Sequence, residues 1–287
     1  MAIVVNTNVP ALGAAKDLNN ATSALNKSLQ RMSSGYKINS AKDDAAGAYI
    51  ATNMETQIRG SKVAQNNVAT GANVLQIAEG NLNVLESNLQ RIRDLAVQAA
   101  NAVYSTDSMN AMKAEVTERA SEITRIATAA EFNGLKLFDG STGALGDKGL
   151  RLQVAANSKK EDNSVTIASS VFGYASAGTL GLTTSSITTA FSSAAGAAAF
   201  IATVDTALAN LNNRKSTIGA YQNKLESAMQ NLVINVENTT AARSTIMDAD
   251  IAEESINFSK SQILQQTTAS MLAQANAMPQ LALKLIG

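Results

Sequence analysis

A strict seven-residue repeat in the first half of the chain constrains the fold more than any other feature. In steps of seven, one series of positions holds leucine or alanine, and a second series three residues later holds alanine, leucine or isoleucine. The eight positions are Leu75, Leu82, Leu89, Ala96 and Ala78, Leu85, Ile92, Ala99. Such a repeat lines one side of an α-helix with apolar side chains that another helix must cover. We therefore predict one long helix over residues 45–101, roughly 80 Å in length.

A second stretch with the same repeat supplies a partner for that helix. Residues 194–245 carry apolar side chains at a seven-residue step, and a shorter amphipathic helix is expected over residues 106–130. The chain has two prolines, one near each end, so no interior proline interrupts these helices. The residues predicted to pack the helical rod are Leu75, Leu82, Leu85, Leu89, Ile92, Val204, Leu211, Ile218, Leu225 and Leu232.

The two ends of the chain are amphipathic as well. Residues 11–36 predict a helix that stops at Gly35, and a C-terminal helix follows the capping sequence Asp248-Ala249-Asp250. We expect these two helices to pair, with Leu264, Met271 and Leu272 against Leu18 and Leu25. The residues predicted to pack this pair are Leu18, Leu25, Met32, Ile256, Ile263, Leu264, Met271 and Leu272.

Between the helices the apolar period changes from about 3.5 to two. Residues from about 132 to 182 alternate apolar and polar side chains between glycine-rich turns, which predicts three or four short strands. Residues 183–193 hold eight Ser or Thr in eleven positions, which is typical of a solvated loop or connector, with an O-glycosylated zone as the alternative. The fold class is therefore mainly α: a long antiparallel helical rod with a small β-region at its tip and paired terminal helices.

This pattern predicts a nested domain organisation. Residues 1–42 and 246–287 form one domain of paired terminal helices, and residues 43–182 with 194–245 form the helical rod with its β-region. Residues 183–193 connect the β-region to the last rod helix.

Composition excludes most kinds of active site. The chain has no His, Cys or Trp, which removes most zinc sites, haem ligands and nucleophile–base pairs. Its formal net charge is zero, so there is no general attraction to nucleic acid or anionic membrane, and we expect no membrane span, cofactor or metal. Asp248, Asp250, Glu253 and Glu254 could in principle hold a divalent cation, but helix capping explains them without one. Arg91 and Arg93 flank Ile92 as a solvated face or a protein-contact patch.

Five long motifs make the chain resemble bacterial flagellin over about 1–140 and 195–287. They are SLQRMSSGYKINSAKDDAAGAYIAT, LQRIRDLAVQAAN, AEFNGLKLFDG, DADIAEESINFSKSQILQQTTASMLAQAN and the terminal PQLALKLIG. The resemblance implies a subunit that self-assembles into the extracellular flagellar filament for swimming motility. Its end helices would form the inner filament core and would be disordered in the free monomer. The apolar stripe around Leu264, Met271 and Met278 of the C-terminal helix would also contact neighbouring subunits. The variable outer domains of the family have almost no counterpart here.

The resemblance also implies partners. They are further copies of the chain, an export chaperone at the C-terminal helix, and the hook–filament junction and cap proteins. Export would occur unfolded through the flagellar type III channel, in agreement with an N-terminus that lacks the pattern of a secretory signal. In flagellins sensed by the flagellin-recognising Toll-like receptor, an Arg and a Leu of the motif QRIRELAVQ and a Glu on the next helix contact the receptor. The matching residues here are Arg91, Leu95 and Glu115, and Asp94 stands where the motif usually has Glu.

Two other classes of protein remain to be separated from this one. A hook–filament junction protein has similar end helices, although the LQRIRDLAVQ and DADIAEES runs favour a flagellin. A secreted adhesin or toxin-like binding module would need an elaborate tip, and the stretch after Val165 is short and plain. An enzyme is the least supported alternative, and a flagellin-embedded zinc peptidase is excluded because HExxH needs histidine.

Overall fold

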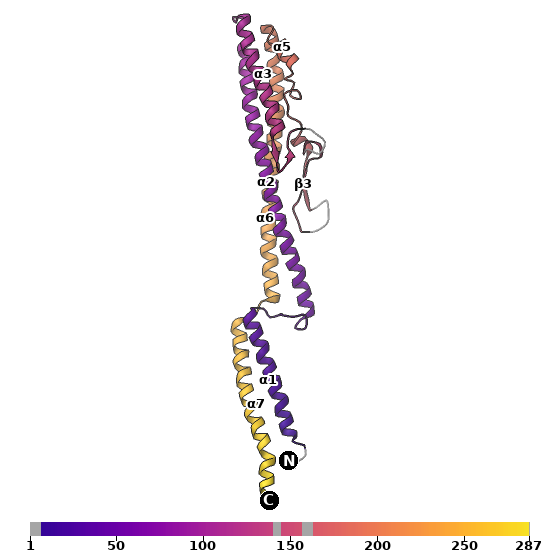
Figure 1. The fold of residues 1–287 in the computed structure, drawn as a ribbon, viewed down its shortest axis with the longest axis vertical. Helices are drawn as coiled ribbons and strands as arrows, with labels where there is room; N and C mark the ends of the chain where they lie inside the picture. The colour runs from indigo at the N-terminus through magenta and orange to yellow at the C-terminus, as the bar shows by residue number, and fades with distance from the viewer. Residues whose placement is uncertain (1–6, 140–144, 157–162, 287) are drawn as a thin grey trace. The chain divides into compact units, whose positions relative to one another are not determined.

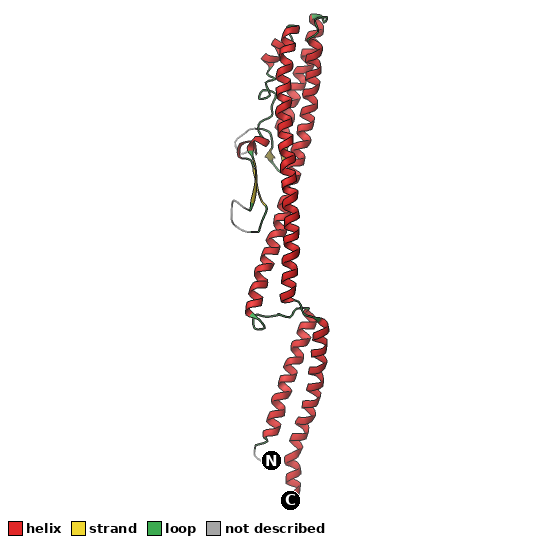
Figure 2. Ribbon diagram, turned by 180° about the vertical axis from the view of Figure 1, so that it is seen from behind, coloured by secondary structure: helices red, strands yellow, loops and turns green. Residues whose placement is uncertain are grey.

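The computed structural model describes residues 7–139, 145–156 and 163–286, with side chains described up to residue 279. About three quarters of it is helical, and the fold class is mainly α, as predicted (Figures 1 and 2). The chain divides into two compact units, Met1–Ile58 with Glu237–Gly287, and Arg59–Val236, which we describe separately. The elements are α1 (Val9–Ser34), α2 (Ala45–Ala99), α3 (Thr106–Ala129), β1 (Glu131–Phe132), β2 (Leu135–Lys136), α4 (Leu145–Lys148), β3 (Leu150–Gln153), β4 (Ser164–Ile167), the 3-10 helix η1 (Ser169–Val171), α5 (Thr184–Ala190), α6 (Ala194–Met247) and α7 (Ile251–Ile286).

In the unit Arg59–Val236, helices α2, α3 and α6 bury the heptad positions. The ten residues predicted to pack the rod are all at most 5% exposed and belong to one core cluster. Cross-helix contacts fix the direction of the pair: Glu79 accepts a hydrogen bond from Gln222, and Glu86 lies 2.6 Å from Lys215. Since numbers rise along α2 as they fall along α6, the two helices run antiparallel.

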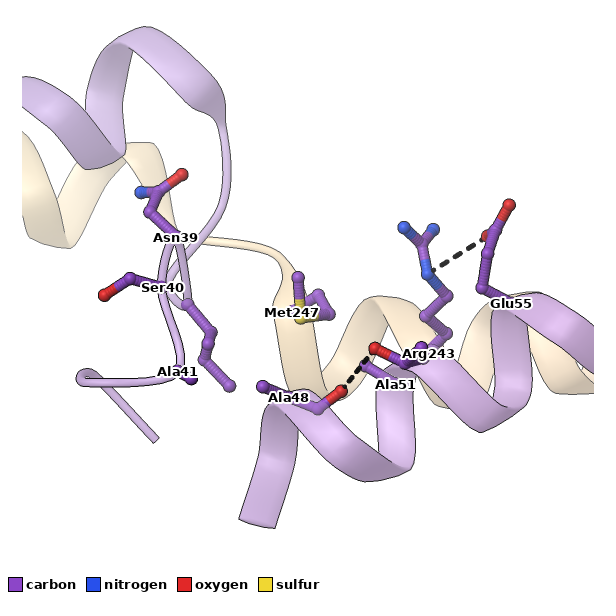
Figure 3. A pocket seen from close by; sticks show the side chains of 10 residues that line it. Asn39, Ser40, Ala41, Ala48, Ala51, Glu55, Arg243 and Met247 are labelled. Atoms are coloured by element: carbon purple, nitrogen blue, oxygen red, sulfur yellow. Dashed lines mark hydrogen bonds and ion pairs between the residues drawn. The ribbon is translucent and has the colours of Figure 1, made fainter. Parts of the chain in front are cut away.

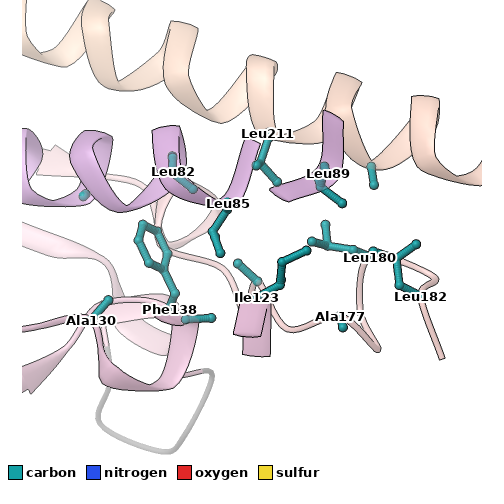
Figure 4. Close-up of a cluster of buried hydrophobic side chains, with 14 of the residues drawn as sticks. Leu82, Leu85, Leu89, Ile123, Ala130, Phe138, Ala177, Leu180, Leu182 and Leu211 are labelled. Carbon is teal, nitrogen blue, oxygen red and sulfur yellow. The ribbon is translucent and has the colours of Figure 1, made fainter. Parts of the chain in front are cut away.

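The β-region contributes to the same core. Phe138, which follows β2, is fully buried and points toward Leu82 and Leu85 of α2 (Figure 4). Strands β1 and β2 form a hairpin whose Asn133 and Gly134 both have positive φ, as a tight two-residue turn requires. Strands β3 and β4 pair antiparallel, with Leu152 opposite Val165. Four short strands in two sheets agree with the predicted β-region.

Strand β3 lies along α2, where small residues allow it to approach. A Cβ on Gly71 would come within 2.1 Å of a Leu152 methyl carbon, and a Cβ on Gly60 within 2.6 Å of Ala156. These two glycines are eleven residues apart, close to three full helical turns, and therefore share one face of α2. The β-region thus packs on the side of its helices, whereas the sequence suggested their tip.

The Ser/Thr-rich segment 183–193 is a second difference from the sequence analysis. The expected loop is a short helix, α5, capped by the Thr183 side chain, which accepts from the Ser186 N–H. Ile187, Ala190 and Phe191 are buried, and the Phe191 ring meets Phe200 edge to face. Three apolar residues at a helical spacing form the buried face, and the hydroxyls that gave the segment its polar composition bond to the helix's own backbone.

Helix α6 is, among the described helices, the one long and apolar enough to cross a membrane by length and composition alone. Its residues Val204, Leu211 and Ile218 are fully buried within the protein core. Helix packing accounts for these buried positions, and 28% of the most apolar window of α6 is buried.

Candidate functional site

Helices α1 and α7 pair antiparallel in the unit formed by the two chain ends (Figure 1). The Asn8 side chain at the start of α1 donates a 2.8 Å hydrogen bond to the Ala275 carbonyl. At the other end of α1, Arg31 donates to Glu254 at 2.8 Å. The predicted pairing of the two end helices is therefore present within a single chain.

The buried face of this pair consists of small and polar side chains. It is formed by Ala11, Ala21, Ser28, Glu254 and Ser261. The Arg31–Glu254 ion pair is largely removed from water, and the Nε atom of Arg31 is buried with no hydrogen-bond partner among the described residues. Since a broken buried ion pair is costly, this contact specifies the register of α1 against α7 more than it adds stability.

The residues predicted to make the α1–α7 contact are placed differently from the expectation. Leu18, Leu25 and Met32 of α1 are half-buried, as is Leu272 of α7. The other four are on the surface: Ile256 is 69% exposed, Ile263 62%, Leu264 45% and Met271 60%. The expectation that Leu264 and Met271 lie against Leu18 and Leu25 is therefore wrong for the single chain.

The reason is that α1 contacts a different side of α7 from the side that the sequence predicted. The side of α7 that faces α1 carries Glu254, Ser261, Thr268 and Ala275, which also follow a seven-residue step. Leu264 is three positions beyond Ser261, which turns it by roughly 60° from that line. Small side chains allow close helix contact, so α1 covers them and leaves the larger apolar side chains outside. A heptad of Glu, Ser, Thr and Ala was the sequence signal for this contact.

Five large, exposed apolar residues of α7 define a surface that we call the outer stripe. It consists of Ile256, Ile263, Leu264, Met271 and Met278. A shallow groove lined by Ile256, Ile263 and Leu264, with Ser255, Ser259 and Lys260 at its edges, follows part of the stripe. Val9, Leu12 and Leu29 on α1 are exposed as well. Clustered, exposed apolar side chains such as those of this groove mark a protein interaction site.

The connector between α1 and α2 is held by two adjacent carboxylates. Asp43 lies 2.9 Å from the Lys27 ammonium and accepts from the Ser40 N–H, and the Lys27 contact, with help from Ser40 and Asn39, lowers the pKa of Asp43 to about 2. Asp44 caps α2 by accepting from the Gly47 N–H. The connector borders a hollow in which Arg243 of α6 meets Glu55 of α2 at 3.4 Å (Figure 3).

Two of the three predicted receptor-contact residues lie together on the surface of the helical unit. Arg91 makes a two-pronged contact with Glu115, with the shorter distance 2.9 Å, and Arg119 also reaches Glu115. The hydrogen bonds from Arg91, and then those from Arg119, lower the pKa of Glu115. The third residue, Leu95, is 3% exposed and offers no surface for a contact.

The acidic residues around the start of α7 have structural roles. Asp248 accepts from the Ser244 hydroxyl, Asp250 caps the helix by accepting from the Ala252 N–H, and Glu254 pairs with Arg31. In the described ranges of the chain, no group of three or more acidic, His or Cys side chains is arranged to hold a metal ion.

Long packed helices, paired chain ends and an apolar stripe on the outside are the features of a structural protein that associates through helix-to-helix contacts. Comparison with known families agrees with that class. The profile of the bacterial flagellin N-terminal helical region matches residues 5–142, and that of the C-terminal helical region matches residues 201–286. The chain belongs to the bacterial flagellin family, whose role in the flagellar filament is structural.

Full-length relatives support this membership. The chain is 38% identical over 291 residues to the flagellar filament core protein flaB2 of Brachyspira hyodysenteriae, covering 99% of this chain and 100% of the relative. It is 34% identical over 296 residues to flagellin FlaB1 of Treponema pallidum, with the same coverage. A putative flagellar hook-associated protein from Vibrio parahaemolyticus has a similar fold, with a TM-score of 0.59, 17% identity, and coverage of 72% of this chain and 100% of the other.

Proposed function

We propose that this protein is a subunit that self-assembles into the flagellar filament through the outer stripe of α7. The observation that supports the proposal is that the five large apolar side chains of the outer stripe are exposed, outside the side of α7 that faces α1. Transfer of one such side chain from water into a contact is worth roughly 1.5–3 kcal/mol. Because the contact recurs at every subunit, this free energy accumulates along a polymer.

The small and polar seam between α1 and α7 supports the same proposal. Burial of alanine, serine and an ion pair stabilises a helix pair less than burial of leucine does. In the free subunit the pair then gains little free energy to set against the conformational entropy of the two chain ends. We propose that α1 and α7 become fully ordered when neighbouring copies cover the outer stripe.

Leu264→Asp tests the proposal directly. The charge would have to be buried at the subunit contact, so the variant should remain a folded monomer and fail to form filaments. Gln266→Asp is the matched control, because it places the same side chain at an exposed polar position of the same helix. Filaments seen by electron microscopy after seeding would distinguish the two. Normal filaments from Leu264→Asp would refute the role of the outer stripe.

Export and partner proteins follow from the same surface. A chain whose terminal helices order late is suited to pass unfolded through the flagellar type III channel and reach the outside of the cell. A cytosolic chaperone that covers the outer stripe would keep it from premature assembly, and the junction and cap proteins of the filament would contact it at the two filament ends. The test is limited proteolysis with and without the chaperone. The chaperone should protect α7 from cleavage, and Leu264→Asp should lose that protection.

Recognition by the flagellin-sensing Toll-like receptor is a second proposed activity. The exposed pair of Arg91 and Glu115 supports it, since two adjacent helices hold a fixed charged feature there. Leu95 would then act from beneath, by packing under this surface. Arg91→Ala should reduce activation of receptor-bearing reporter cells by about tenfold, as loss of a charged contact does. Arg125→Ala, which breaks an exposed pair on α3, should leave activation unchanged.

A further inference from the structure

Arg214 of α6 differs from the other arginines whose partners are described. Arg31, Arg91, Arg93, Arg119, Arg125 and Arg243 each lie within 4.0 Å of a carboxylate. Among the residues that the structure describes, no carboxylate pairs with Arg214, whose guanidinium donates instead to the Gly173 carbonyl. The adjacent Lys215 is neutralised by Glu86 on the α2 side of the helix.

This guanidinium is held partly out of water. Burial lowers the pKa of Arg214, although arginine stays charged at any physiological pH. The backbone at Gly173 lies close to it: a Cβ on that residue would be 3.3 Å from the Arg214 Nη2 atom. A partly buried cation without a carboxylate is unfavourable, and an anion from outside would relieve this cost.

The guanidinium borders a hollow whose walls offer further polar groups. Ser170 of η1 and Asn210, Asn213 and Thr217 of α6 line it, with Val171 as an apolar wall. Hydroxyl and amide groups are the side chains that, beside an arginine, bind oxygen anions through several hydrogen bonds. The hollow has a volume of about 360 Å³, which leaves room for a small oxyanion together with water.

We infer that this hollow, formed by η1 and α6 around Arg214, is an oxyanion-binding site. The planar guanidinium presents parallel N–H donors that match two oxygens of a carboxylate, phosphate or sulfate. The oxyanion has two possible sources: a free inorganic anion, or a carboxylate side chain of a neighbouring copy of the chain. The first source is independent of the proposed function, and the second rests on it.

The first experiment uses the monomeric full chain and inorganic phosphate. Thermal unfolding is compared in phosphate and in chloride at equal ionic strength and neutral pH. A bound phosphate raises the melting temperature of the unmutated chain, and Arg214→Gln should weaken phosphate binding about tenfold. Lys224→Gln is the control, since it removes a positive charge from an exposed position of the same helix. General salt effects act equally on both variants.

Asn213→Asp gives an independent test that does not require the loss of Arg214. It places a tethered carboxylate at the rim of the hollow. The variant should be more stable than the unmutated chain in chloride, and phosphate should no longer shift its melting temperature. The control is Asn212→Asp, which adds the same charge at an exposed position of α6 outside the hollow.

The second experiment identifies the source of the anion. If phosphate does not raise the melting temperature of the monomer, the remaining source of the anion is a carboxylate of a neighbouring copy. Arg214→Gln and Asn213→Asp should then raise the critical concentration for assembly about tenfold, whereas Lys224→Gln and Asn212→Asp should not. Assembly of the two controls separates this result from a failure of the proposed function. The oxyanion site would be overturned if phosphate raised the melting temperature of all variants equally. It would also be overturned if Arg214→Gln and Asn213→Asp changed neither the phosphate response of the monomer nor its assembly.

Discussion

The two units of this protein use the same heptad spacing in opposite ways. In the helical unit, the seven-residue steps of α2 and α6 hold leucine, isoleucine and valine, and the chain itself buries them. In the pair of chain ends, the seven-residue step of α7 that faces α1 holds Glu254, Ser261, Thr268 and Ala275, and the outer stripe is exposed. The position of the large apolar side chains therefore distinguishes the two units. The helical unit buries them within one chain, whereas the pair of chain ends leaves them exposed for a partner.

The largest expected effect comes from truncating one leucine to alanine in each of the two units. Leu85→Ala should destabilise the monomer by about 3 kcal/mol, because Leu85 is fully buried and alanine leaves a cavity. Leu264→Ala should change the stability of the monomer by less than about 0.5 kcal/mol, because Leu264 is on the surface. Urea unfolding followed by circular dichroism measures both values. Similar losses would mean that the outer stripe is already covered in the monomer.

A smaller effect tests whether polar contacts hold the chain ends together. Arg31→Ala removes the partner of the buried Glu254 and should weaken the α1–α7 pair by about 2 kcal/mol. Arg125→Ala breaks an exposed pair with Glu122 and should cost at most about 0.5 kcal/mol. Hydrogen exchange of the amides of α7 and α3 reports each loss locally. An unchanged exchange rate in α7 would show that the ion pair does not set the register.

The smallest effect concerns the connector between α1 and α2. The pKa of Asp43 is lowered from 3.8 to about 2 by its contact with Lys27, so the folded state favours the ionised carboxylate. This contribution to stability is complete above about pH 5 and is lost as the pH falls through about 2. Asp43→Asn should lower the stability of α1 at neutral pH and remove that part of its acid dependence, so that the variant and the unmutated chain become alike near pH 2. An acid transition identical to that of the unmutated chain would contradict the Lys27 contact.

Features carried by large apolar side chains could be predicted from the sequence. Leu75 to Ala99 gave the length and the packing face of α2, and Val204 to Leu232 gave those of α6. The side of α7 that faces α1 was not predicted, because its seven-residue step holds Glu, Ser, Thr and Ala, and the apolar pattern of Ile263, Leu264 and Met271 is the stronger signal. The helix α5 was missed for a related reason: a polar composition concealed three apolar residues at a helical spacing.

Contacts between distant segments were also beyond the sequence analysis. The position of β3 along α2 depends on Gly60 and Gly71, which carry no apolar signal and matter only because another segment lies against them. Nothing in the sequence distinguishes Arg214 from the other arginines, since its lack of a carboxylate partner depends on the positions of segments that are distant in the chain.

The pairing of α1 with α7 has a consequence for the order of folding. Asn8 and Ala275 are 267 positions apart in the chain, whereas Arg91 and Glu115, which join α2 to α3, are separated by 24. Contacts between close neighbours form fast, and contacts that close a long loop form slowly. When the chain emerges with its N-terminus first, α1 must wait for the last segment before it can pair. The helical unit can therefore fold first, and the chain ends close last.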